Sequence, residues 1–114
     1  MNPPGRFGIC FFGCSTYSCL PRPFSDIQVR ADGRTRSVEK THDLQHKHIE
    51  WLLDPMPEIL IIGIGWDGIV KVDEKIQKGA GCEVRIEKTG KAIGLFNSLK
   101  KQKRKVAIHV HSTC

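Results

Sequence analysis

Three glycines at the end of an apolar segment have the spacing of a nucleotide-binding loop. Residues 58–68 read Glu-Ile-Leu-Ile-Ile-Gly-Ile-Gly-Trp-Asp-Gly, so Gly63, Gly65 and Gly68 follow the pattern G-x-G-x-x-G. In a dinucleotide fold such glycines let the backbone turn sharply and approach a pyrophosphate closely. Glu87, roughly 20 residues further along the chain, has the expected place of the acidic residue that binds the ribose.

The segment after these glycines argues against a dinucleotide site. A pyrophosphate binds where the last glycine begins a helix whose amides face the anion. Residues 69–72, Ile-Val-Lys-Val, favour an extended conformation instead, and the next helix is expected only after Asp73. We therefore interpret the glycines as a structural turn and predict no cofactor. The alternative is a pocket for a small molecule or anion at this loop, formed by His42, Gly63, Gly65, Trp66, Asp67 and Gly68.

A run of basic residues near the C-terminus is the second candidate for chemistry. It carries most of the net charge of +6 and consists of Lys100, Lys101, Lys103, Arg104 and Lys105. Such a patch can neutralise nucleic-acid phosphates, but cations also gather at helix C-termini and stay solvated there. Because no nucleic-acid-binding motif accompanies the run, weak nucleic-acid binding is an alternative that we do not favour.

The cysteines and histidines lack the spacing of metal or catalytic sites. Cys10, Cys14 and Cys19 do not form paired C-x2-C clamps, and no H-E-x-x-H motif contains His42, His46 or His48. In the last predicted strand His109, His111 and Thr113 share one face, and three apolar side chains occupy the other. We predict no metal and no catalytic residue, so the chain is expected not to be an enzyme.

Length and composition indicate one domain in a reducing compartment. The chain has 114 residues, of which 39% are hydrophobic and 26% charged, and no apolar segment reaches the ~20 residues of a membrane span. The first residues resemble neither a secretory signal nor a transit peptide, and five unevenly spaced cysteines do not indicate a disulfide framework. We expect a cytoplasmic protein that does not enter a membrane; its oligomeric state is not defined by the sequence.

The N-terminal half is expected to contain two strands and one helix. Residues 7–12 and 26–30 are predicted to pair as strands, with residues 13–23 forming a loop and Asp32-Gly33 a turn. Residues 41–43 are predicted to cap a helix that ends at Asp54-Pro55.

The C-terminal half is expected to alternate strands and helices. A buried strand at 58–64 precedes a short helix at 73–78, and a strand at 82–86 has the alternation typical of a sheet edge. A helix from Thr89 and a strand at 105–111 complete the pattern. The predicted fold is an α/β domain with a mixed sheet, N-terminal antiparallel strands and about three helices.

Several short motifs, taken in order, resemble one known family. They are Phe7-Gly8, Gly13, Tyr17, Asp26-Ile27, Asp32-Gly33, Thr41-His42, residues 60–65 (Leu-Ile-Ile-Gly-Ile-Gly), Ala92-Ile93, Asn97 and the ending Val-His-Ser-Thr-Cys. Together they are similar to the Mth-type domain family over nearly the whole chain, although residues 14–23 are longer and 33–41 shorter than expected. Val110 also stands where an aromatic residue is usual.

The resemblance implies a single compact three-layer domain over residues 1–114, in small proteins of unassigned activity. A mitochondrial member assists the assembly of respiratory complex I. No catalytic residues are implied. We therefore expect a non-enzymatic domain that acts through contacts with a protein partner, such as in the assembly of a larger complex.

Overall fold

The computed structural model describes residues 26–111 in full and the backbone of residues 9–12 and 17–20. Its elements in chain order are β1 (Ile9–Phe12), β2 (Tyr17–Leu20), β3 (Asp26–Val29), β4 (Thr35–Val38), β5 (Asp43–Leu44), α1 (His46–Ile49), the 3-10 helix η1 (Glu50–Leu53), β6 (Ile59–Gly63), β7 (Lys71–Val72), α2 (Glu74–Gly79), β8 (Glu83–Glu87), α3 (Thr89–Lys101) and β9 (Val106–Val110).

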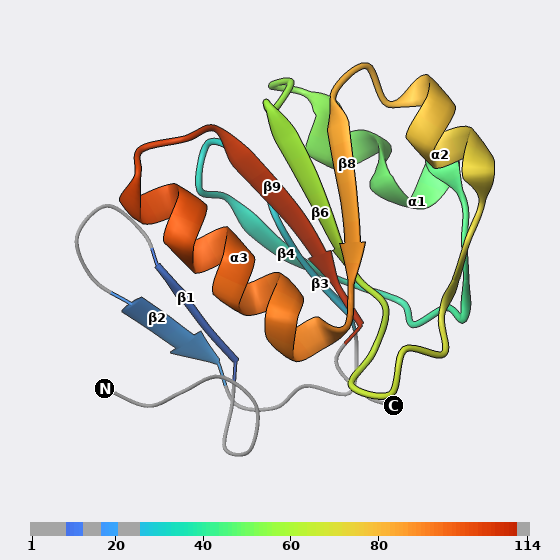
Figure 1. Ribbon diagram of the computed structural model, residues 1–114, viewed down its shortest axis with the longest axis horizontal. Coiled ribbons are helices and arrows are strands. Elements are labelled where there is room, and N and C mark those ends of the chain that lie inside the picture. The colour runs from blue at the N-terminus through green and yellow to red at the C-terminus, as the bar shows by residue number, and fades with distance from the viewer. Residues whose placement is uncertain (1–8, 13–16, 21–25, 112–114) are drawn as a thin grey trace.

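Five strands form a mixed sheet in the order β4-β3-β9-β6-β8 (Figure 1). Strand β6 is parallel to β8 and β9, whereas β3 is antiparallel to β4 and β9. The predicted buried strand at 58–64 is thus the interior strand β6. The predicted edge position of the strand at 82–86 is confirmed by β8.

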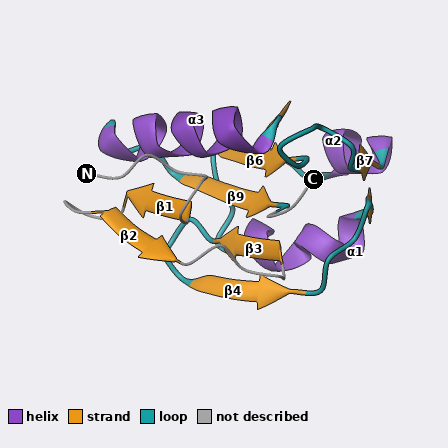
Figure 2. Ribbon diagram, turned by 90° about the horizontal axis from the view of Figure 1, so that it is seen from below, coloured by secondary structure: helices purple, strands orange, loops and turns teal. Residues whose placement is uncertain are grey.

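Helices cover both faces of the sheet, which gives the predicted three-layer α/β fold (Figure 2). On one face Ala92, Ile93 and Phe96 of α3 pack on alternate apolar residues of β3, β6 and β9. On the other face α1, η1 and α2 contribute Ile49, Leu52 and Ile76 to a second core over β6 and β8. The helical stripe predicted for α3 is confirmed, because its apolar positions recur every three to four residues.

The glycine segment is a turn, as the sequence indicates. A Cβ on Gly63 would lie 3.3 Å from both Cβ of Ala92 and Oγ1 of Thr89, so this glycine lets α3 approach β6 closely. Gly65 and Gly68 have φ angles of 102° and 73°, which side-chain-bearing residues rarely adopt. Residues 69–72 are not helical and end in β7, so no helix N-terminus follows the glycines.

The N-terminal pairing predicted from the sequence is wrong. Strand β1 pairs with β2, which lies inside the segment predicted as a loop, and β3 pairs with β4 and β9. Both hairpins close over short connections, which cost less chain entropy than the longer connection between residues 12 and 26. Between β3 and β4, the predicted Asp32-Gly33 turn is confirmed by the Gly33 N–H, which donates to Arg30 O at 2.9 Å.

The predicted start of the first helix is also wrong. Asp43 and Leu44 form β5, which pairs in parallel with β7, and Gln45 is the N-cap of α1. Thr41 Oγ1 instead accepts a hydrogen bond from the Asp43 N–H at 3.1 Å, which closes a local turn. By contrast, the predicted cap of the second helix is confirmed, because Asp73 Oδ1 accepts from the Lys75 N–H at 2.9 Å.

Within residues 9–12, 17–20 and 26–111, the helices are too short or too polar to span a bilayer.

Candidate functional site

One half of the sheet face beneath α1 is polar. Strands β3 and β9 alternate, so Ile27 and Val29 face the α3 core while Asp26 and Gln28 face the opposite side with His109 and His111. These four polar side chains are at most 1% exposed. Burying a polar group without a hydrogen-bond partner costs free energy of folding, so the contacts of each of these side chains affect stability.

Gln28 connects the edge strand to the buried histidine of β9. Its Nε2 lies 2.7 Å from His48 O and 3.0 Å from His109 Nδ1, and its Oε1 accepts from Arg36 Nε at 2.8 Å. Because Arg36 can only donate, Oε1 must be the acceptor and Nε2 the donor to both other groups. His109 Nδ1 is therefore an acceptor, and the ring proton lies on Nε2.

Asp26 lies between two imidazoles. Its carboxylate oxygens are 3.4 Å from His109 Nε2 and 3.0 Å from His111 Nδ1. Burial alone would raise the pKa of Asp26, but the close contacts with the two histidines outweigh it and hold that pKa below its usual value. The exposed His42 meets His111 edge to face, with ring centroids 5.0 Å apart. The cluster therefore extends from solvent at His42 to the floor of a cavity at His109.

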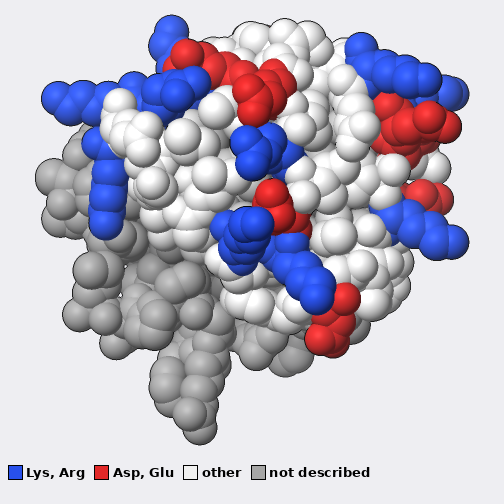
Figure 3. Space-filling view, viewed as in Figure 1, with Lys and Arg blue, Asp and Glu red and all other residues white. Residues whose placement is uncertain are grey.

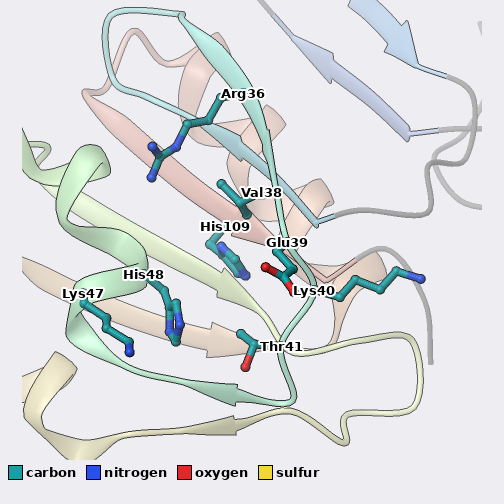
Figure 4. A pocket seen from close by; sticks show the side chains of 8 residues that line it. All are labelled: Arg36, Val38, Glu39, Lys40, Thr41, Lys47, His48 and His109. Atoms are coloured by element: carbon teal, nitrogen blue, oxygen red, sulfur yellow. The ribbon is translucent and has the colours of Figure 1, made fainter.

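A cavity of about 420 Å³ opens above this polar half of the sheet (Figure 4). Strand β4 and the extended segment after it form one wall, α1 forms the opposite wall, and β9 provides the floor. Its lining residues are Arg36, Val38, Glu39, Lys40, Thr41, Lys47, His48 and His109. This volume falls in the range of small-molecule sites.

Arg36 is held in a fixed orientation at the cavity wall. Its Nε donates to Gln28, and its guanidinium carbon lies 4.5 Å from the centroid of the Trp51 ring, which Arg30 also approaches at 4.7 Å. Burial and the charge of Arg30 lower the pKa of Arg36. Within the described part of the chain, no hydrogen bond or ion pair involves the terminal nitrogens of Arg36. Two parallel N–H donors thus remain for an oxyanion.

Two residues of α1 add to this donor set. His48 Nδ1 accepts from the Gln45 N–H at 2.8 Å, so the proton of the neutral ring is on Nε2. Lys47 precedes it and is exposed. Figure 4 shows Arg36 and Lys47 directed into the cavity, whereas the Lys40 side chain extends away from it.

The residues predicted around the glycine loop do not line this cavity. The Gly65 and Thr89 N–H groups bond internally to Thr89 Oγ1 at 2.9 Å and Gly65 O at 3.0 Å, respectively. The Gly68 N–H donates to Gly65 O at 3.2 Å. Trp66 packs on α3 beside Gly90, and Asp67 is exposed. The amides of Gly65 and Gly68 are thus engaged within the turn, and a ligand there stays a prediction.

The basic run surrounds the C-terminal end of α3 (Figure 3). Glu58 partly neutralises it, because Arg104 Nε lies 3.4 Å from the Glu58 carboxylate. Lys100 Nζ points back to Ala31 O at 3.4 Å, and Lys103 has a φ of 61° at the chain reversal after the helix. The run therefore spans a helix end and a turn rather than one helix face.

The chemistry-bearing residues missed by the sequence lie in β3, β4 and α1. The alternation Asp-Ile-Gln-Val in β3 and the histidines of β9 are a signal that two polar strand faces could meet. Arg36 had no such signal, because its strand was not predicted. Across the described residues, no group of three or more His, Cys, Asp or Glu side chains could hold a metal ion. The side chains of Cys10 and Cys19, and all of Cys14 and Thr113, lie outside the described parts.

The fold and cavity define a small three-layer α/β domain with a basic, partly buried pocket. The chain belongs to the DUF498/DUF598 family of proteins of unknown function, whose model matches residues 15–111.

Solved structures share this fold. A protein called MT938 has 26% identity and a TM-score of 0.68, with 96% of this chain and 95% of that one covered. A conserved hypothetical protein, PH1505 from Pyrococcus horikoshii OT3, has 22% identity and a TM-score of 0.67, with 79% and 84% covered. A protein described as an outer membrane protein from Bartonella henselae has 18% identity and a TM-score of 0.72, with 99% and 93% covered. The search of curated proteins found no match.

Proposed function

We propose that this domain binds a small anionic ligand in the cavity between β4 and α1. The observation that carries the proposal is Arg36, whose guanidinium is oriented by Gln28 and Trp51 while its terminal nitrogens face the cavity. A preoriented guanidinium binds carboxylate or phosphate oxygens in pairs and loses little side-chain entropy in doing so. Lys47 and the Nε2–H of His48 supply further donors on the facing wall.

Binding without catalysis is the better-supported activity for this site. His109 Nδ1 accepts from Gln28, and His109 Nε2 is buried 3.4 Å from the Asp26 carboxylate. His109 therefore presents no free nitrogen to a ligand as a general base. The proposal moves the predicted anion site from residues 63–68 to the β4–α1 cavity.

Titration calorimetry with glutarate and inorganic phosphate tests the proposal. Arg36→Gln should weaken binding by roughly tenfold or more, because a charge-assisted hydrogen bond contributes about 1.5–3 kcal/mol. Lys47→Gln, which leaves the Gln28 contacts intact, should also weaken it. Arg34→Gln removes the same charge from the same hairpin, but its side chain is 76% exposed and lines no part of the cavity, so binding should be retained. Absence of binding by either anion, or equal losses in Arg34→Gln and Arg36→Gln, would refute the proposal.

A second candidate is binding to a protein partner, for which the open edge of β4 is the supporting observation. In the described part of the sheet β4 pairs only with β3. Residues 34, 36 and 38 face β3 in the hydrogen-bonded register, so the N–H and C=O groups of Thr35 and Ser37 point outward. An extended segment of a partner can add to such an edge. The resemblance to Mth-type domains agrees with this candidate, because a mitochondrial member assists the assembly of a complex. We keep the expectation that the protein is cytoplasmic.

A further inference from the structure

The cavity contains an anionic side chain of its own. Figure 4 shows the Glu39 carboxylate directed into the cavity beside His109, whereas Arg36 extends into the cavity from β4 and Lys47 from α1. Within the described residues, Glu39 forms no hydrogen bond or ion pair that would explain this orientation. The cavity thus receives positive charge from β4 and from α1 and negative charge from Glu39 beside His109.

We propose that the ligand is a zwitterion of amino-acid type, with a carboxylate near Arg36 and Lys47 and an ammonium group near Glu39. This inference rests on the proposed function and specifies its ligand class. A simple anion would meet the Arg36 fork but leave Glu39 as a repulsive neighbour. A ligand that also carries an ammonium group converts that repulsion into attraction.

The size and lining of the cavity agree with such a ligand. A volume of about 420 Å³ lies within the range of small-molecule sites and accommodates a molecule of amino-acid size. Val38 is half-buried and gives the same wall an apolar position, and Thr41 also lines the cavity. The side chain of an amino acid would find an apolar contact at Val38.

Lys40 does not change this charge pattern. It follows Glu39 in the extended wall, but its side chain extends out of the cavity, as expected from the alternation of an extended segment. His48 and His109 act as neutral rings in the hydrogen-bond arrangement described above. The charges that face the ligand are therefore those of Arg36, Lys47 and Glu39.

L-glutamate and glutarate are a matched pair of probes, since they differ only in the α-ammonium group. Calorimetry on the full chain should show tighter binding of L-glutamate, and Glu39→Gln should weaken it by roughly fivefold or more while strengthening glutarate, as for a close charge pair at a binding site. Glu74→Gln carries the same charge change on α2, where the side chain is 82% exposed, and should leave both affinities unchanged.

The outcomes separate the two proposals. If glutarate binds in an Arg36-dependent way but L-glutamate binds no tighter, and Glu39→Gln alters neither affinity, the zwitterion inference is wrong and the anion site stands. If L-glutamate binds Glu39→Gln and the unchanged chain with equal affinity, the zwitterion inference is also wrong. If neither molecule binds, both the inference and the proposed function fail.

Discussion

Gln28 is the residue on which the geometry of the pocket depends most. Its amide bonds to three groups on three elements: the Arg36 side chain of β4, the His109 ring of β9 and the His48 carbonyl of α1. Only one orientation of the amide satisfies all three, so Gln28 fixes the Arg36 fork and the tautomer of His109 together. A single buried amide thus links the cavity wall to its floor.

Asp26 makes a pH-dependent contribution to stability. Because its pKa is lower in the folded protein than its usual 3.8, the unfolded chain binds more protons below about pH 4, and the free energy of unfolding falls as the pH drops there. Asp26→Asn should lose roughly 1–3 kcal/mol at pH 6, as expected for a disrupted buried polar contact. The difference between the two proteins should shrink near pH 3.

Urea denaturation at pH 6 and near pH 3 measures this effect. Asp67→Asn provides the control, because Asp67 is exposed and should change stability by no more than about 0.5 kcal/mol. A constant difference between Asp26→Asn and the unchanged chain across this range would show that the charge of Asp26 is not linked to folding.

At the scale of elements, β4 determines both candidate functions. Its inward-facing side chains Arg36 and Val38 line the cavity, while its outward backbone groups at Thr35 and Ser37 form an open sheet edge. The two candidate functions can therefore be tested separately. Substitutions of the inward side chains affect the cavity, whereas loss of an outward backbone N–H affects the sheet edge.

Ser37→Pro should disrupt binding of a partner to the β4 edge without disturbing the pocket. Proline removes the outward N–H at residue 37, and β3 does not use that donor in this register. A partner that co-purifies with the unchanged chain and with Ser37→Ala should be lost from Ser37→Pro, as measured by affinity capture and mass spectrometry. Equal recovery of that partner with Ser37→Pro would exclude an edge contact, and glutarate affinity checks that the pocket is intact.

Elements with regular patterns were predictable from the sequence, whereas those defined by distant pairing were not. The stripe of Ala92, Ile93 and Phe96 and the alternation of β9 are local signals, and both α3 and β9 form as predicted. Strand β4, by contrast, reads Thr-Arg-Ser-Val with almost no apolar periodicity, because it is an exposed edge. Its pairing with β3 follows from the turn at Gly33 and not from its own residues.

The candidate site was largely unpredictable for the same reason. Its parts come from segments separated by up to about 70 residues, and only the fold brings Arg36, Lys47 and His109 to one cavity. The glycine segment showed the strongest motif, yet Gly63 serves close packing and Gly65 a turn. The glycine motif is therefore structural, whereas the β4–α1 cavity, which has no sequence motif, provides the candidate chemistry.

At the scale of the whole molecule, the two faces of the sheet have different roles. The α3 face is packed with apolar side chains, whereas the opposite face is apolar over β6, β8 and Ala107 of β9 and polar over β3 and the histidines at the end of β9. The short helices α1 and η1 lie at the boundary between these halves. The cavity therefore lies where the second apolar core ends. Its buried polar residues are held between that core and the α3 core.

The central claim is that an anion binds in the β4–α1 cavity and not at the glycine turn or the basic run. Side-chain and backbone NMR spectra recorded during a glutarate titration test it most directly, because all three sites report separately in one experiment. The account predicts saturable shifts at the Arg36 Nε–H, the Gln28 side-chain amide and the amides of Lys47 and His48. Shifts confined to residues 63–68 or to residues 100–105 would contradict it.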